Sequence, residues 1–219
     1  MKWHYIFTLC RKDFLIEFRQ RQTILGILLY IASTAFVVYL SVNKPDAITW
    51  NALFWIMQLF IVTNAVAKSF MGDSKNRQLY YYAIAHPIHY IFSKIIGNII
   101  LVTGLNIINI LIYFTLMGNP TLNSGIYFII TLFGGISLSL IFTLLSAIAS
   151  KAQQQASLLA ILGFPIILPL LMLLIRLSKV AFGEIFRENA VIQLFGLLLG
   201  LDLVIIIMSF ILFPYLWKE

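Results

Sequence analysis

The sequence predicts an all-α membrane protein with six transmembrane helices, and its composition and patterning are the reasons. Hydrophobic residues make up 61% of the 219 residues, whereas charged residues make up 11%. Soluble domains average about 45–50% apolar and about 25% charged residues. The apolar residues gather in continuous runs, most of them near the roughly 20 residues that a helix needs to cross a bilayer. They do not alternate with polar residues, as strands of a membrane β-barrel would.

Six apolar runs qualify as spans, so residues 1–219 are predicted to form one transmembrane domain. The spans are expected at about 24–42, 51–67, 95–117, 126–149, 156–175 and 191–213. With the N-terminus in the cytoplasm, eleven of the fifteen Lys and Arg residues fall in cytoplasmic segments and four in outer loops. Because Lys and Arg resist translocation, both termini are expected inside, and the net charge of +7 does not indicate nucleic-acid binding.

Residues 1–22 precede the first span and are predicted to form an amphipathic helix in the cytoplasmic interface. Apolar side chains recur there at helical spacing: Trp3, Phe7, Cys10, Phe14 and Phe18. The cations fall mainly on other faces of this helix, where anionic headgroups would attract them. The alternative is a helix that packs on the protein's own spans.

Residues 68–94 form the longest polar stretch between spans and are predicted to lie in the cytoplasm. Asp73 or Ser74 provides an N-cap for a short helix over residues 75–85. That helix is expected to end before Pro87, because the residue before a proline disfavours the helical conformation. A short cytoplasmic helix between the second and third spans is therefore predicted.

The segments predicted to lie on the outer side are short. Trp50 and Trp55 stand near the outer boundary of the second span, where indoles favour the headgroup level. Residues 118–125 are expected to form a tight uncharged turn, and residues 176–190 form the largest outer segment, a candidate for a short interfacial helix.

Two features within the spans indicate special roles. Pro165 and Pro169 each remove a backbone donor from the fifth span, which is predicted to be kinked or broken. The kink is either part of a moving helix or static. Asp202 lies near the middle of the sixth span, where a charge costs at least ~2.5–3.5 kcal/mol. It is expected to face protein or a watery cavity, either as a residue of a pathway or as a structural polar contact.

Polar and small residues in the third and fourth spans are predicted to join helices, as such residues commonly do in lipid. In the third span they are Asn98, Thr103, Gly104, Asn106 and Asn109. In the fourth span they are Gly134, Gly135, Ser137 and Ser139.

No pattern in the sequence indicates catalytic chemistry. The phosphate-binding pattern G-x-x-x-x-G-K-[ST] does not occur, so any ATP that drives this protein must bind another polypeptide. His4, His86 and His89 share no spacing that would join them into a metal or haem site. The single cysteine, Cys10, excludes an internal disulfide.

Three stretches carry a resemblance that runs over nearly the whole chain. They are EFRQRQTILGILLY at 17–30, KSFMGDSKNRQLYYYAIAHPIHYIFSKIIGN at 68–98 and SLLAILGFPIILPLLM at 157–172. With six spans and no nucleotide site, the chain resembles the permease subunit of an ABC-2-type exporter and, more narrowly, the haem exporter B family (CcmB) of cytochrome c maturation. The double-proline fifth span is typical of that family. At Gln78, Tyr80 and Tyr81 the family often has acidic residues.

The resemblance implies a place in a larger complex of the bacterial inner membrane. Two permease copies would pair with two copies of a cytoplasmic ATPase (CcmA-like) and work with CcmC-like and CcmD-like membrane proteins. ATP hydrolysis would be tied to haem delivery or to release of a haem-loaded periplasmic chaperone (CcmE-like). This chain is expected to bind no cofactor, because ATP lies on the partner and haem is handled by the complex.

The resemblance also implies that segment 73–86 is a coupling helix that docks in a groove of the ATPase. The residues expected there are Asp73, Arg77, Leu79, Tyr82, His86 and Pro87. Closure of the ATPase dimer would move this helix and, through it, the fifth span or the outer segment 176–190.

Three alternatives remain at this stage. The chain could serve an exporter of another cargo, such as a lipid, a polysaccharide or a drug. It could be a membrane assembly scaffold without energy coupling. A membrane enzyme using Asp202 and a histidine is the third, although the histidines lie on the wrong segments for it.

Overall fold

The computed structural model describes a bundle of long helices. The described residues are 8–12, 15, 21–42, 45–66, 87–150, 155–183 and 189–218. The elements are α2 (Arg21–Ser41), α3 (Ala47–Val66), α5 (Pro87–Met117), α6 (Ser124–Ala149), α7 (Gln155–Ser178), the 3₁₀ helix η1 (Lys179–Phe182) and α8 (Ala190–Lys218). Within these ranges, six helices are long and apolar enough to cross a bilayer, which confirms the predicted all-α membrane fold.

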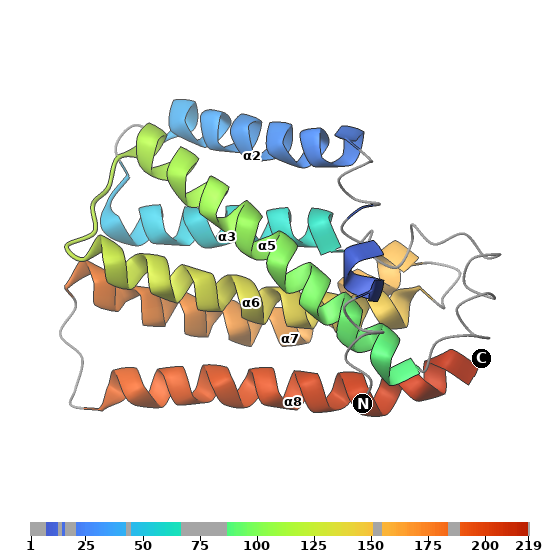
Figure 1. Ribbon diagram of the computed structural model, residues 1–219. Helices are drawn as coiled ribbons and strands as arrows, with labels where there is room; N and C mark the ends of the chain where they lie inside the picture. The colour runs from blue at the N-terminus through green and yellow to red at the C-terminus, as the bar shows by residue number, and fades with distance from the viewer. Residues whose placement is uncertain are drawn as a thin grey trace.

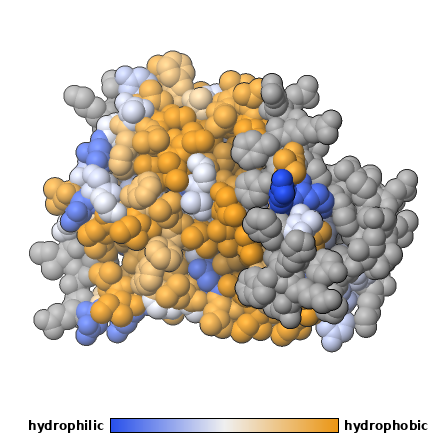
Figure 2. Space-filling view, viewed as in Figure 1, coloured by the Kyte–Doolittle hydropathy of each residue, from blue (hydrophilic) through white to orange (hydrophobic). Residues whose placement is uncertain are grey.

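Helix α6 lies at the centre of the bundle and contacts α3, α5, α7 and α8 (Figure 1). In its most apolar window 72% of the residues are buried, against 17% in α2 and 22% in α8. Helix α2 starts and helix α8 ends at the same end of the bundle (Figure 1). An apolar surface covers the middle of the bundle, and hydrophilic residues gather at the end that carries the α5–α6 loop (Figure 2). This distribution fits a protein whose solvent is a bilayer.

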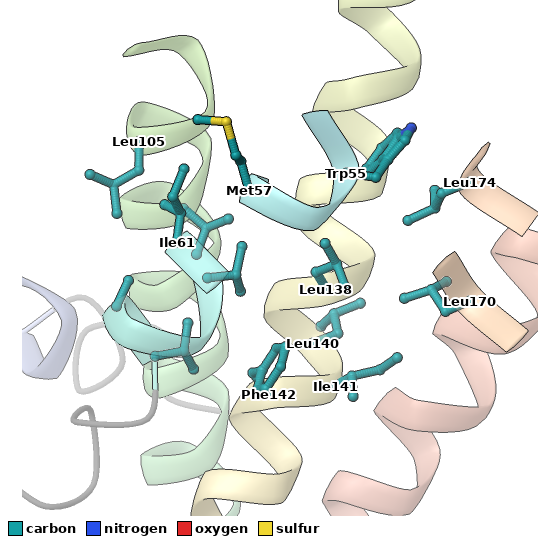
Figure 3. Close-up of a cluster of buried hydrophobic side chains, with 14 of the residues drawn as sticks. Trp55, Met57, Ile61, Leu105, Leu138, Leu140, Ile141, Phe142, Leu170 and Leu174 are labelled. Atoms are coloured by element: carbon teal, nitrogen blue, oxygen red, sulfur yellow. The ribbon is translucent and has the colours of Figure 1, made fainter. Parts of the chain in front are cut away.

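Small residues let the neighbouring helices approach α6 closely. The space that a side chain would fill at Gly134 is taken by the Trp55 ring of α3 and by Leu174 of α7. At Gly135 an added Cβ would lie 2.9 Å from Asn106 Nδ2. Figure 3 shows Trp55 and Leu174 beside each other at α6. Gly134 and Gly135, two of the glycines predicted to join helices, therefore do so, in the way that small residues act in membranes.

Trp50 and Trp55 lie inside the bundle, with 1% and 0% of their surfaces exposed. The Trp50 ring meets the rings of Tyr113 at 4.8 Å, Tyr127 at 5.3 Å and Phe182 at 5.8 Å between centroids. Neither indole therefore faces the headgroups, whereas the depth predicted for them near the outer boundary stays a prediction. Both lie on the face of α3 that packs against the bundle, so burial among other rings replaces the interface as their environment.

All six helices are longer than the spans predicted from hydropathy, and α5 and α8 exceed them most. Helix α5 starts at Pro87, eight residues before the predicted start at 95, and α8 continues through Pro214 to Lys218. Proline fits the first position of a helix because the backbone N–H that it lacks would be unpaired there. Hydropathy predicts only the part of a helix that lies in the hydrocarbon core, whereas the helix itself can extend beyond that core.

The predicted interfacial helix over 1–22 falls largely outside the described residues. Residues 8–12 are helical, and Cys10 Sγ donates a hydrogen bond to the backbone oxygen of Ser93 on α5 at 3.3 Å. This contact supports the alternative in which the N-terminal segment packs on the protein's own helices.

We predict that Gly134→Ala destabilises the bundle by about 1–3 kcal/mol, because its Cβ would overlap the Trp55 ring in a packed core. Gly104→Ala is the matched control, since nothing lies within 4 Å of a Cβ at that helical position. Thermal unfolding in one detergent measures both. Equal melting temperatures for the two variants would contradict the close packing at Gly134.

Asp46 directly precedes α3 and gives a second prediction. A hydrogen bond with the Thr49 side chain lowers the pKa of Asp46 below its ordinary value of 3.8. A lowered folded-state pKa stabilises the protein above the ordinary value, and this stability is lost as the pH falls through the folded value. The stability of the wild type relative to Asp46→Asn, which keeps a capping side chain, should therefore decrease below about pH 4. A constant difference in melting temperature across that range would refute this role.

Candidate functional site: buried polar contacts between the helices

A row of buried polar contacts joins α5 to α3 and α6. Its members, called here the polar seam, are Gln58, Asn98, Asn106, Asn109, Thr131 and Thr143. Asn98 Nδ2 donates to Thr143 Oγ1 at 2.9 Å, and Asn106 Nδ2 donates to the Thr131 backbone oxygen at 2.6 Å. Asn109 Nδ2 donates to Gln58 Oε1 at 2.9 Å. The prediction that these asparagines join helices is confirmed.

The polar seam is only partly satisfied. Within the described part of the chain, Gln58 Nε2, Asn106 Oδ1 and Asn109 Oδ1 are buried without a hydrogen-bond partner. Each such buried group costs about 1–3 kcal/mol in general. Buried polar groups without a partner call for an explanation, and a functional role is one of the explanations.

A second polar contact, called here the Ser178 clasp, ties α7 to α3 and α6. It consists of Asn51, Trp55, Tyr127 and Ser178. Trp55 Nε1 donates to Ser178 Oγ at 3.0 Å, and Ser178 Oγ lies 2.9 Å from Asn51 Oδ1 and can donate to it. Asn51 Nδ2 donates to the backbone oxygen of Ile175 at 3.1 Å, and Tyr127 Oη to Asn51 Oδ1 at 3.4 Å. The clasp holds the end of α7.

The α5–α6 loop is joined to η1, directly beyond the clasp. The backbone N–H of Asn123 donates to the oxygen of Ala181 at 3.1 Å. Gly183 ends η1 with φ of +82°, and Leu122 occupies the space where a side chain on Gly183 would stand. The segment predicted as a short interfacial helix over 176–190 is thus the end of α7 followed by η1, with residues 184–188 outside the described ranges.

Helix α7 carries both prolines of the fifth span. It is continuous from Gln155 to Ser178, so the alternative of a broken helix is wrong, whereas a kink at Pro165 and Pro169 stays a prediction. Both prolines are exposed. Leu170 and Leu174 are fully buried and point toward α6 and α3 (Figure 3). Among the described side chains of α7, Leu170 and Leu174 therefore pack this helix on the bundle.

Asp202 faces the protein, with 8% of its surface exposed. Its Oδ2 lies 2.8 Å from Ser137 Oγ on α6. Its Oδ1 is buried without a partner among the described residues. Of the two roles predicted for Asp202, the structural polar contact is present, and a place in a pathway stays a prediction.

Several other predicted residues lie apart from these contacts. Asp73, Arg77, Leu79, Tyr82 and His86 of the predicted coupling helix lie outside the described residues, as does His4, while Pro87 is the first residue of α5. Gly104 is exposed, so it joins no helices. Among the residues that the structure describes, no group of three or more His, Cys, Asp or Glu side chains could hold a metal ion.

The arrangement agrees with a comparison against protein families. The family model described as CcmB protein matches residues 4–215. The chain belongs to the CcmB family. Membership makes it a membrane component of a haem-exporter ABC system for cytochrome c maturation, in the bacterial inner membrane. None of the curated proteins compared with the chain matches it.

The Ser178 clasp of this CcmB-family chain is a contact that the sequence did not reveal. Ser178 is separated from Trp55 by 123 residues and from Asn51 by 127. The sequence contains one signal for such a contact, a polar residue on an apolar helix. Ser178 does not carry this signal in the predicted spans, because residues 176–190 are expected to form an outer segment. Only the packing of α7 on α3 brings these groups together.

We predict that Ser178→Ala destabilises the protein by about 0.6–1.7 kcal/mol, the range for interhelical hydrogen bonds in membranes. Ser209→Ala is the matched control, because Ser209 is equally buried. Each hydroxyl lies 2.8 Å from a backbone oxygen of its own helix, Leu174 for Ser178 and Ile205 for Ser209, but the Ser178 hydroxyl also contacts Trp55 and Asn51 on α3. Unfolding of both variants in mixed micelles checks this. If Ser209→Ala costs as much as Ser178→Ala, the clasp contributes nothing beyond a local hydrogen bond.

Proposed function

We propose that this CcmB-family chain is a non-catalytic permease subunit that couples ATP hydrolysis by a partner ATPase to haem delivery or to release of a haem-loaded periplasmic chaperone. The observation that carries the proposal is the family match over residues 4–215. The proposed partners are a CcmA-like ATPase, CcmC-like, CcmD-like and CcmE-like proteins and a second copy of the chain. Both termini are proposed to be cytoplasmic.

The connection between α3 and α5 supports this coupling route. Helix α3 ends at Val66 and α5 starts at Pro87, so segment 67–86 is the connection between these two helices. The Gln58–Asn109 bond joins the same two helices inside the bundle. A force that an ATPase applies to this segment would therefore act on α3 and α5 together.

The Ser178 clasp supports the next step of the route. Through Trp55 and Asn51, α3 is hydrogen-bonded to the end of α7. The backbone bond between Asn123 and Ala181 continues the connection from η1 to the α5–α6 loop. A shift of α3 relative to the bundle would be transmitted to the end predicted to face the chaperone. Packed contacts of this kind have discrete arrangements that a ligand on another chain can bias.

We predict that the double substitution Leu79→Asp and Tyr82→Asp reduces co-purification of the ATPase about tenfold or more, the effect of losing a well-packed apolar contact at an interface. The control is Leu122→Glu, a charge placed at an exposed leucine of the α5–α6 loop, at 79% exposure. Tagged protein is purified from its native membrane in mild detergent, and bound ATPase is quantified. Normal ATPase recovery with the double variant would overturn the proposed coupling segment.

The same preparation separates the proposal from a scaffold. With an ATPase that binds ATP but cannot hydrolyse it, the complex should assemble while cytochrome c maturation stops. Full maturation with that inactive ATPase would favour a scaffold without energy coupling. Normal maturation after loss of this chain would favour a different cargo.

A further inference from the structure

The contact between Asp202 and Ser137 contains more acceptors than one hydroxyl can serve. Ser137 Oγ lies 2.8 Å from Asp202 Oδ2 and 3.1 Å from the backbone oxygen of Phe133. A serine hydroxyl has a single proton, so it can donate to only one of these oxygens at a time. An ionised carboxylate only accepts hydrogen bonds, and then either its Oδ2 or the Phe133 oxygen receives no proton from Ser137.

The second carboxyl oxygen adds to this imbalance. Asp202 Oδ1 is buried and has no hydrogen-bond partner in the described part of the chain. An ionised carboxylate spreads its charge over both oxygens and needs donors or a cation for each. Ser137 is the one hydrogen-bond partner that the described residues give Asp202.

We propose that Asp202 is a proton-binding site at the contact between α6 and α8. Its carboxyl group is protonated at neutral pH and donates a hydrogen bond from Oδ2 to Ser137 Oγ. Ser137 then donates its own proton to the Phe133 oxygen. Each proton has one acceptor, and Oδ1 is an uncharged carbonyl oxygen whose burial costs far less than that of a carboxylate.

The charged and titratable groups on α5 and α8 lie far along the helices from Asp202. His89, Tyr90 and Lys94 stand near the start of α5, where the Tyr90 ring stacks on Phe213 at 5.8 Å. Phe213 follows Asp202 by eleven residues on α8, which is about 16 Å. Tyr215 and Lys218 lie further along α8, and Tyr113 lies at the opposite end of α5, against Trp50.

The groups on α6 and α7 do not neutralise the acid either. Tyr127 precedes Ser137 by ten residues on α6, about 15 Å along the helix. Arg176 is exposed in the last turn of α7. No described cation lies within 4.0 Å of the Asp202 carboxyl oxygens. A proton is therefore the ligand that fits this site, and its loss would leave an unpaired charge between α6 and α8.

Infrared spectroscopy of the full chain in phospholipid vesicles tests the proposal. At neutral pH, the spectrum of the wild type minus that of Asp202→Asn should contain the carbonyl stretch of a protonated carboxylic acid. Ser137→Ala should move this band to higher frequency, because the acid loses its acceptor. Asp46→Asn is the control and should remove no such band at neutral pH, since Asp46 is exposed and its pKa is lowered.

A second measurement needs no substitution and keeps the test valid if Asp202→Asn fails to fold. The chain has four aspartates, Asp13, Asp46, Asp73 and Asp202. The aspartate carboxyl carbons are labelled with ¹³C, and the ¹³C spectrum of the full chain is recorded at neutral pH. One carboxyl signal should be that of a protonated acid, and the others should be those of ionised carboxylates. Four ionised aspartates at neutral pH, or a protonated-acid band that survives Asp202→Asn, would overturn the proposal.

Discussion

In a bilayer the apolar side chains gain little by leaving lipid for the protein interior, so close contact and hydrogen bonds decide which helices associate. Helix α6 depends on this constraint most, because it is the helix that the others surround. Gly134 and Gly135 bring Trp55 and Asn106 against its backbone. The polar seam then fixes the register of α5 on α3 and α6 through specific amide contacts.

The same contacts support the coupling route proposed for this chain. The segment that is proposed to meet the ATPase enters α3 and α5, and these two helices are bonded to each other and to α6. The Ser178 clasp extends the connection from α3 to the end of α7, while Pro165 and Pro169 of α7 are exposed.

The sequence was sufficient for the six spans, because each apolar run is continuous, and for the joining role of Asn98, Asn106 and Asn109. The sequence alone does not show which face of a helix packs against the bundle. Both Gly104 and Gly134 are small residues in apolar spans, so the same contact between helices is predicted for each. Gly104 is nevertheless exposed, whereas Gly134 lies under the Trp55 ring. The sequence likewise does not show that the Trp50 and Trp55 side chains lie inside the bundle. Contacts across more than a hundred residues, such as the Ser178 clasp, leave no local pattern.

The central claim is that specific amide contacts between helices hold the bundle, and a double-mutant cycle on Gln58 and Asn109 tests it most directly. Gln58→Leu and Asn109→Leu each leave a buried amide without its partner, whereas the double variant removes both amides. We expect a coupling energy of about 0.6–1.7 kcal/mol in unfolding from mixed micelles, with the double variant more stable than the single costs predict. Additive effects of the two substitutions would contradict the account.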